Sequence, residues 1–115
     1  MSIVFSQNDN ELVVNDNKIV FDHKIRYVKE VRETLIVLLE IPSNEVYLNN
    51  VFGITSIGII KWRIQNVGDV FPIKNQLPFE NLMLQGSDMF VSDFYGRRYS
   101  INPANGEILS SDIAR

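Results

Sequence analysis

Short runs of alternating apolar and polar residues, separated by clusters of Asn, Asp, Gly and Pro, are the feature that most restricts the fold of this chain. Residues 12–14 and 18–21 are one example, because three polar residues, Asn15, Asp16 and Asn17, separate two such runs. A period of two places alternate side chains on opposite faces of a strand, and Asn and Asp tolerate the left-handed conformations of tight turns. The sequence therefore predicts an N-terminal hairpin and, more broadly, a succession of short strands.

The segment that follows the hairpin predicts two further strands. Residues 25–31 have the pattern of a half-exposed strand, and residues 34–41 are apolar on both faces, which is typical of a central strand covered on both sides. Pro42 ends that run, because proline cannot donate a hydrogen bond to a sheet. The stretch 27–39 can also be drawn as an amphipathic helix, but its β-branched residues and the lack of a capping box favour strands.

The second half of the chain continues the pattern of short strands. Strands are predicted at residues 45–48, 51–54, 59–64, 79–84, 89–92, 97–101 and 107–109. A polar loop at residues 65–78 is the longest irregular segment. The clearest turn covers residues 102–106, where Pro103 presets one backbone angle and Gly106 can adopt a positive φ near the end.

Two parts of the chain, residues 25–64 and 79–113, form a weak internal repeat. The matching residues are Gly58 with Gly106, Phe52 with Tyr99, and Ile54 with Ile101. Each copy has the pattern of a four-stranded antiparallel meander. The chain of 115 residues has the size of one domain. We therefore predict a single all-β domain, 1–115, in which two blade-like four-stranded sheets pack together behind the N-terminal hairpin.

The outer hairpins of the two copies resemble those of blades in quinoprotein-type β-propellers. The resemblance rests on residues 58–62 (GIIKW) and 102–109 (NPANGEIL). Such blades have an acidic or amide residue before the turn, a Gly that closes it, and a Trp four residues later. Here Ile54 replaces the acidic residue in the first copy, and Ser110 replaces the Trp in the second. The resemblance implies blade-like geometry without a quinone cofactor, and two blades packed face to face, because a ring needs at least four.

The composition limits the possible partners and compartment. The chain has no Cys, a net charge of −3 and a pI of about 5.0. Disulfides, thiolate metal sites and a cysteine nucleophile are excluded, and a cytoplasmic location is expected because no signal peptide is apparent. Nucleic acids and anionic membranes are disfavoured as partners, since their binding normally requires a basic surface.

The sequence offers few groups for catalysis. His23 is the only histidine, and its neighbour Asp22 would point to the opposite face of a strand, so a solvated turn histidine is the favoured interpretation. One His without Cys does not make a zinc site, and no phosphate-binding loop or nucleophile elbow occurs. Trp62 is expected in the core. We therefore predict no enzymatic activity, no cofactor and no metal.

A hairpin tip at residues 93–98 is the most suggestive surface feature, because it combines two aromatic residues with charges of both signs. The predicted partner-binding residues are Asp69, Glu80, Asp88, Asp93, Phe94, Tyr95 and Arg97. The carboxylates among them would imitate nucleic-acid phosphates toward a basic partner. In size, acidity and lack of motifs the chain resembles small immunity proteins, which implies a non-catalytic protein that neutralises a toxin by direct binding.

Two other functions stay open at this point. One is a small-molecule-binding or enzymatic domain with a pocket between the sheets, lined by Asp22, His23, Trp62 or Arg98. The other is a self-associating structural module in which exposed strand edges pair between chains.

Overall fold

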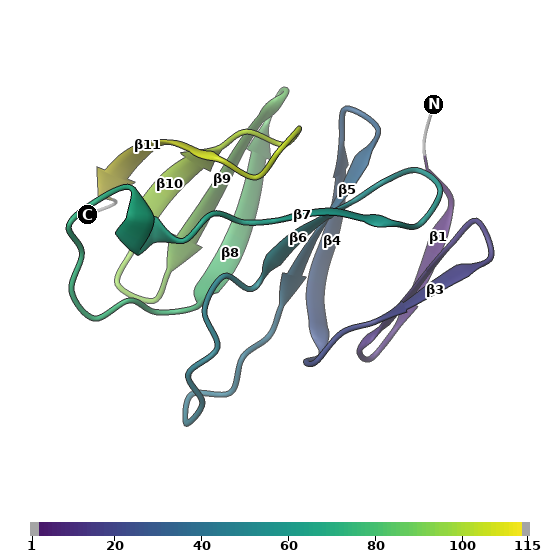
Figure 1. Ribbon diagram of the computed structural model, residues 1–115, viewed down its shortest axis with the longest axis horizontal. Helices are drawn as coiled ribbons and strands as arrows, with labels where there is room; N and C mark the ends of the chain where they lie inside the picture. The colour runs from purple at the N-terminus through teal and green to yellow at the C-terminus, as the bar shows by residue number, and fades with distance from the viewer. Residues whose placement is uncertain (1–2, 114–115) are drawn as a thin grey trace.

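The computed structural model describes residues 3–113, whose strands form three antiparallel sheets side by side in chain order (Figure 1). The N-terminal sheet contains β1 (Phe5–Asn8), β2 (Glu11–Val14) and β3 (Asn17–Val20). The middle sheet contains β4 (Ile25–Val31), β5 (Thr34–Leu39), β6 (Val51–Ile54) and β7 (Ile60–Arg63). The C-terminal sheet contains β8 (Phe79–Gln85), β9 (Asp88–Asp93), β10 (Arg97–Ile101) and β11 (Ile108–Ile113). The predicted all-β class and the two four-stranded meanders are confirmed.

The N-terminal sheet extends the predicted hairpin by one strand. The hairpin itself, β2 and β3, turns through Asn15 and Asp16 at φ of 49° and 66°, the conformation that suits a two-residue hairpin turn. The added strand, β1, pairs with β2 in antiparallel register. It was missed because its residues Phe5–Asn8 are mostly polar and all four are exposed, so no alternation marks them.

In the middle sheet, residues 27–39 form strands and not the alternative amphipathic helix. They form β4 and β5, joined by a two-residue turn in which Arg32 and Glu33 have φ of 47° and 62°. Every residue of β5 is buried, as expected for a strand covered on both faces.

The core consists of two hydrophobic clusters, one on each face of the middle sheet. Leu35, Val37 and Leu39 of β5 belong to the cluster shared with the N-terminal sheet, and Ile36 and Leu38 to the cluster shared with the C-terminal sheet. Burying each such side chain contributes roughly 1.5–3 kcal/mol to stability. The alternation along one strand therefore joins all three sheets.

The predicted repeat recurs in the pairing of the strands. β4 and β8 each have 7 residues, and β5 and β9 each have 6. The register shifts near the start of both first strands, between Ile25 and Tyr27 and between Phe79 and Asn81. It shifts again in the third strands, at Ile54 and at Ile101. The two four-stranded sheets thus share their strand order, the lengths of their first two strands and the places of their register shifts.

One predicted strand is wrong. Residues 45–48 lie in an irregular connection between β5 and β6, and Val46 is 87% exposed. The physical reason is that β5 already pairs with β4 on one side and β6 on the other, so no free edge in the middle of this sheet can accept another strand. The predicted loop at 65–78 is observed, with a short 3-10 helix, η1 (Val67–Asp69), inside it. Within residues 3–113, no helix has the length and apolar character needed to cross a membrane.

Candidate functional site

A groove opens at the end of the molecule where β5 and β9 both finish. Residues 40–50 leave β5 there, and residues 94–96 leave β9 at the equivalent place in the second copy. Together with residues 76–80, which lead into β8, they surround a space of about 510 Å³. The repeat thus contributes two of the three walls, and the linker between the copies contributes the third.

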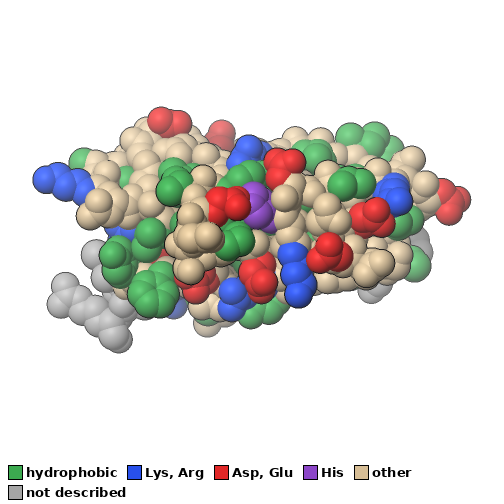
Figure 2. All heavy atoms as spheres, turned by 90° about the horizontal axis from the view of Figure 1, so that it is seen from below, with side chains coloured by type: hydrophobic (Ala, Val, Ile, Leu, Met, Phe, Trp, Pro, Cys, Tyr) green, Lys and Arg blue, Asp and Glu red, His purple; other side chains and the backbone are tan. Residues whose placement is uncertain are grey.

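The groove has an apolar lining with a mainly acidic rim. Its apolar side chains are Ile41, Pro42, Val46, Leu77, Pro78, Phe79, Phe94 and Tyr95. Its charged side chains are Arg26, Glu40, Glu45 and Glu80. Phe94 is 73% exposed and Tyr95 is 61% exposed. Figure 2 looks onto this end of the molecule and shows hydrophobic side chains gathered toward the C-terminal sheet, with acidic side chains around the single histidine.

The carboxylate of Asp93 holds the backbone of the hairpin tip. It accepts hydrogen bonds from the backbone N–H of Tyr95 (3.0 Å) and of Arg97 (3.1 Å), and it pairs with the Arg97 Nε at 2.7 Å. The Asp93 side chain is only 3% exposed. This carboxylate is therefore engaged within the fold, whereas the two aromatic side chains of the tip that it holds are exposed.

Arg97 connects the hairpin tip to the linker. Besides its pair with Asp93, its guanidinium donates to the carbonyl oxygens of Lys74 (3.1 Å) and Asn75 (2.8 Å), and it lies 5.3 Å from the centre of the Tyr95 ring. These contacts fix residues 74–75 just before the linker wall of the groove. Arg97 thus stabilises the position of the hairpin tip and of the linker, both of which line the groove.

Asn50 supports the linker from the other copy, and the sequence prediction missed it. The side chain is completely buried; its Nδ2 donates to the carbonyl oxygens of Leu39 and Phe79, and its Oδ1 accepts from the N–H of Phe79, all at 2.8 Å. A buried amide with three partners ties the end of β5 to the start of β8. The only signal in the sequence was a polar residue directly before a wholly apolar strand.

His23 holds the loop wall of the groove. Its Nε2 contacts the carboxylate of Glu45, and its ring meets the Tyr47 ring edge to face at 4.4 Å. The Tyr47 hydroxyl donates to Asp22 at 3.3 Å. Because the His23 side chain is only 14% exposed, the expectation of a solvated turn histidine is wrong. Burial raises the pKa of Tyr47; the charge of Arg63 opposes this shift, and the charge and hydrogen bond of Asp22 add to it.

The remaining predicted residues divide into two groups. Glu80, Phe94 and Tyr95 line the groove together. Asp69 is exposed at the end of η1, and Asp88 is exposed at the start of β9, the opposite end of that strand from Asp93. The structure therefore brings three of the seven predicted residues into one site, uses Asp93 and Arg97 to support it, and leaves Asp69 and Asp88 apart from the groove lining.

The space between the middle and C-terminal sheets is filled with side chains. Trp62 occupies it and donates from its Nε1 to the carbonyl oxygen of Pro103 at 2.9 Å. The cavity beside this core, near Leu48 and Tyr99, measures about 10 Å³, room for a single water at most. Asp22 and His23 lie instead at the loop of residues 40–50. The side chains proposed to line an intersheet pocket are therefore not gathered around one, and residues 3–113 contain no group of three His, Asp or Glu side chains able to hold a metal ion.

Comparison with known proteins places the chain in a family. A family model described as "Domain of unknown function (DUF7957)" matches residues 2–113, so the chain belongs to that family. No curated protein matches the chain.

Proposed function

We propose that this member of the DUF7957 family is a non-catalytic protein-binding domain and that the groove between residues 40–46, 76–80 and 94–95 receives a segment of its partner. The observation that carries the proposal is the pair of exposed aromatic residues, Phe94 and Tyr95, at one wall of an apolar groove. Aromatic side chains that fill pockets supply much of the energy of protein interfaces. Exposing two of them in water has no evident benefit for the folded chain alone.

The backbone beneath these aromatic residues is held in place before any partner arrives. Asp93 accepts two backbone hydrogen bonds from the tip, and Arg97 pairs with Asp93 and lies beside the Tyr95 ring. A surface that is already ordered loses less conformational entropy on binding. The tip is therefore suited to act as an anchor.

The charges of the groove favour a basic partner. The lining contains three glutamates, Glu40, Glu45 and Glu80, and one arginine, Arg26, and the whole chain carries a net charge of −3. Charge complementarity of this kind accelerates association and selects among partners. The expected occupant is a protein segment with an apolar or aromatic anchor followed by Lys or Arg.

The most concrete form of this proposal is a cytoplasmic bacterial immunity protein that neutralises a toxin by direct binding. A basic toxin domain would meet the acidic rim, and the aromatic anchors would fill an apolar depression on its surface. The support is the small size of the chain, its acidity and the apolar, acidic groove. A ligand pocket between the sheets has less support, because Trp62 and the aliphatic side chains around it occupy that space.

The experiment that tests the binding role is site-specific photocrosslinking in the native cell, with a benzophenone amino acid in place of Tyr95. Leu109 is the matched control position, since it is 60% exposed and lies on β11, outside the groove lining. We expect one basic protein to be crosslinked from position 95 and not from position 109. Identical products from both positions, or none from position 95, contradict the proposal.

Binding of the purified pair then tests the groove itself. We expect Phe94→Ala and Tyr95→Ala each to weaken the complex by roughly 10- to 100-fold, the range of interface anchors, and Leu109→Ala to leave it unchanged. Affinity should also fall as salt concentration rises. Producing the partner in cells with and without this chain tests the immunity role separately from the binding role. A partner that is harmless when produced alone overturns the immunity role and leaves the binding role intact.

A further inference from the structure

The three open sheets leave six edge strands, and the edges differ in how they are protected. Each sheet has a free strand at both ends: β1 and β3, β4 and β7, β8 and β11. An unprotected edge presents unpaired N–H and C=O groups to any other extended chain. Folded proteins therefore protect such strands with charges, proline or bulges, and the exceptions point to pairing surfaces.

Five of the six edges carry such protection. Charged residues stand in β3 (Lys18), β4 (Arg26, Lys29, Glu30), β7 (Lys61, Arg63) and β8 (Glu80), and the pairing of β11 with β10 contains a register shift. β4 and β8 also contain a register shift near their first residues. In addition, the ammonium group of Lys29 donates to the carbonyl oxygen of Leu82 at 2.8 Å, which occupies a backbone group of β8.

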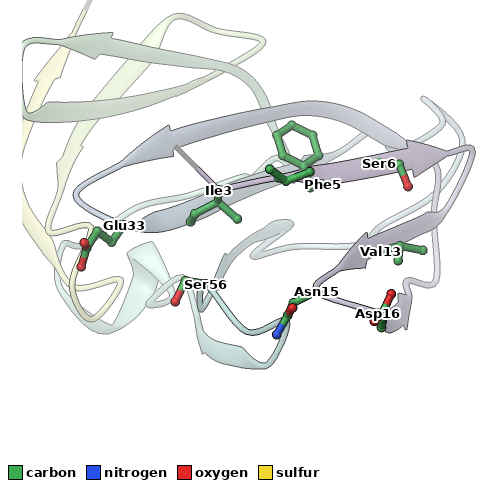
Figure 3. Close-up of a pocket in the computed structure, with 9 residues that line it drawn as sticks. Ile3, Phe5, Ser6, Val13, Asn15, Asp16, Glu33 and Ser56 are labelled. Atoms are coloured by element: carbon green, nitrogen blue, oxygen red, sulfur yellow. The ribbon is translucent and has the colours of Figure 1, made fainter. Parts of the chain in front are cut away.

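β1 is the exception among the edge strands of residues 3–113. Its sequence, FSQN, contains no charged residue and no proline, and its pairing with β2 shows no register shift. All four residues are exposed, and Val4 directly before the strand is 86% exposed. The start of the strand borders an open cavity of about 580 Å³, around which Ile3, Phe5, Asn15, Glu33 and Ser56 are spread (Figure 3).

We propose that β1 pairs antiparallel with β1 of a second copy of this chain, so that two N-terminal sheets become one continuous six-stranded sheet. A strand meeting its own copy across a twofold axis is self-complementary by symmetry. The pairing brings no like charges of the two strands together, because Phe5–Asn8 is uncharged. At the edges formed by β3, β4, β7 and β8, a twofold pairing would bring a charged strand against its own copy.

The geometry of such a pair restricts its register. A twofold axis perpendicular to the sheet keeps each side chain on its own face, so the axis must lie midway between one residue and the same residue of the other copy. Within the four residues of β1, the two central residues that can lie opposite their own copies are Ser6 and Gln7. Directly opposed Cα atoms are about 4.5–5.5 Å apart, which is within the reach of a disulfide.

The natural absence of cysteine makes this directly testable in the full chain. We expect wild-type protein to sediment as a dimer at submillimolar concentration. Of the variants Ser6→Cys and Gln7→Cys, one should form a disulfide-linked dimer much faster than the other under mild oxidation. Lys18→Cys is the matched control, because Lys18 is exposed on the other edge of the same sheet and should crosslink slowly.

A charge variant tests the same contact without new covalent chemistry. Ser6→Lys introduces like charges on the two opposed strands, so it should convert the dimer to a monomer while the circular dichroism spectrum stays native. A wild-type monomer at submillimolar concentration overturns the proposal, as does equal crosslinking at positions 6, 7 and 18. Because β1 belongs to a different sheet from Phe94 and Tyr95, either result leaves the groove proposal untouched.

Discussion

The middle and C-terminal sheets have first and second strands of equal length and register shifts at the same two places, and yet one side chain differs clearly between them. Trp62 in β7 is buried at 8% exposure, and Ser110, at the equivalent place in β11, is exposed. The Trp62 ring packs against Gly106 and the Nε1 reaches Pro103, both in the last turn of the C-terminal sheet. In the described residues, the tryptophan thus occupies the fourth strand of the sheet that packs against a following sheet, and serine occupies the same place in the last sheet.

The connections between the second and third strands differ even more. Residues 40–50 make a long loop in the middle sheet, and residues 94–96 make a short tip in the C-terminal sheet. These two segments form two of the walls of the groove. Two similar sheets thus share the cluster between them, and their unlike connections form two walls of the candidate site.

Removing the tryptophan should have the largest effect. Trp62→Ala leaves a cavity between the sheets and an unpaired carbonyl at Pro103, so we expect the free energy of unfolding to fall by about 3–5 kcal/mol. Ser110→Ala should change it by less than about 0.5 kcal/mol. Urea unfolding followed by circular dichroism measures both. Similar losses in the two variants would end the distinction between the sheets.

Asn50 and Arg97 stand at the start of the third strand in their respective copies, and both hold the linker. Asn50→Ala leaves buried partner groups on Leu39 and Phe79 unsatisfied and should cost roughly 2–4 kcal/mol. Arg97→Ala should cost less, about 1–2 kcal/mol, because its side chain is 18% exposed. Hydrogen exchange should show faster opening of residues 74–80 in both variants. Unchanged exchange there would mean that these side chains do not hold the groove wall.

Substitution of two glycines with positive φ, Gly86 and Gly106, can distinguish the cost of backbone strain from the cost of a steric clash with Trp62. Gly106 has a φ of 77° and a Cβ there would lie 2.5 Å from the Trp62 ring, whereas at Gly86, with a φ of 62°, a Cβ would meet nothing within 4 Å. Gly86→Ala should cost about 1 kcal/mol, and Gly106→Ala clearly more, about 2–3 kcal/mol. Equal losses by urea unfolding would show that the Trp62 ring yields freely.

The alkaline pH dependence should distinguish Tyr99 from its equivalent, Phe52, which does not ionise. Burial raises the pKa of Tyr99 above its ordinary value of 10.0; the charge of Arg97 opposes this shift and the charge of Asp93 adds to it. The unfolded chain therefore loses this proton first as pH rises, so the contribution of Tyr99 to stability is unchanged well below pH 10 and falls above it.

Urea unfolding between neutral pH and pH above 10 measures this decline. Tyr99→Phe should reduce its slope, and a second change at Tyr47, whose pKa is raised by the same cause, should reduce it further. An unaltered slope in Tyr99→Phe would mean that the hydroxyl ionises equally well in the folded and unfolded chains.

The smallest effect on stability is expected at the hairpin tip. Phe94→Ala and Tyr95→Ala should each change the free energy of unfolding by less than about 0.5 kcal/mol, because both rings are largely exposed. The same variants are expected to weaken partner binding strongly. A large loss of stability in either variant would assign the ring to the fold and remove it from the proposed anchor.

Local chemistry of the chain predicted most of the fold. The turns at Asn15-Asp16 and at residues 102–106, the covered strand β5 and the repeat all follow from alternation and turn residues read over a few positions. The same approach wrongly predicted a strand at residues 45–48, which alternate but have no free strand edge to pair with. It missed β1, which pairs with β2 although its residues do not alternate.

What the sequence by itself determined is the set of short strands, their meander order and the side chains able to form a core. Tertiary structure decided which of the suggestive side chains are available: Asp93 and Arg97 are engaged within the fold, and Phe94, Tyr95 and Glu80 meet at the groove. It also left β1 as an uncharged edge. The physical reason is that strand and turn preferences act over neighbouring residues, whereas a groove or a free edge depends on which distant segments the stacked sheets bring together.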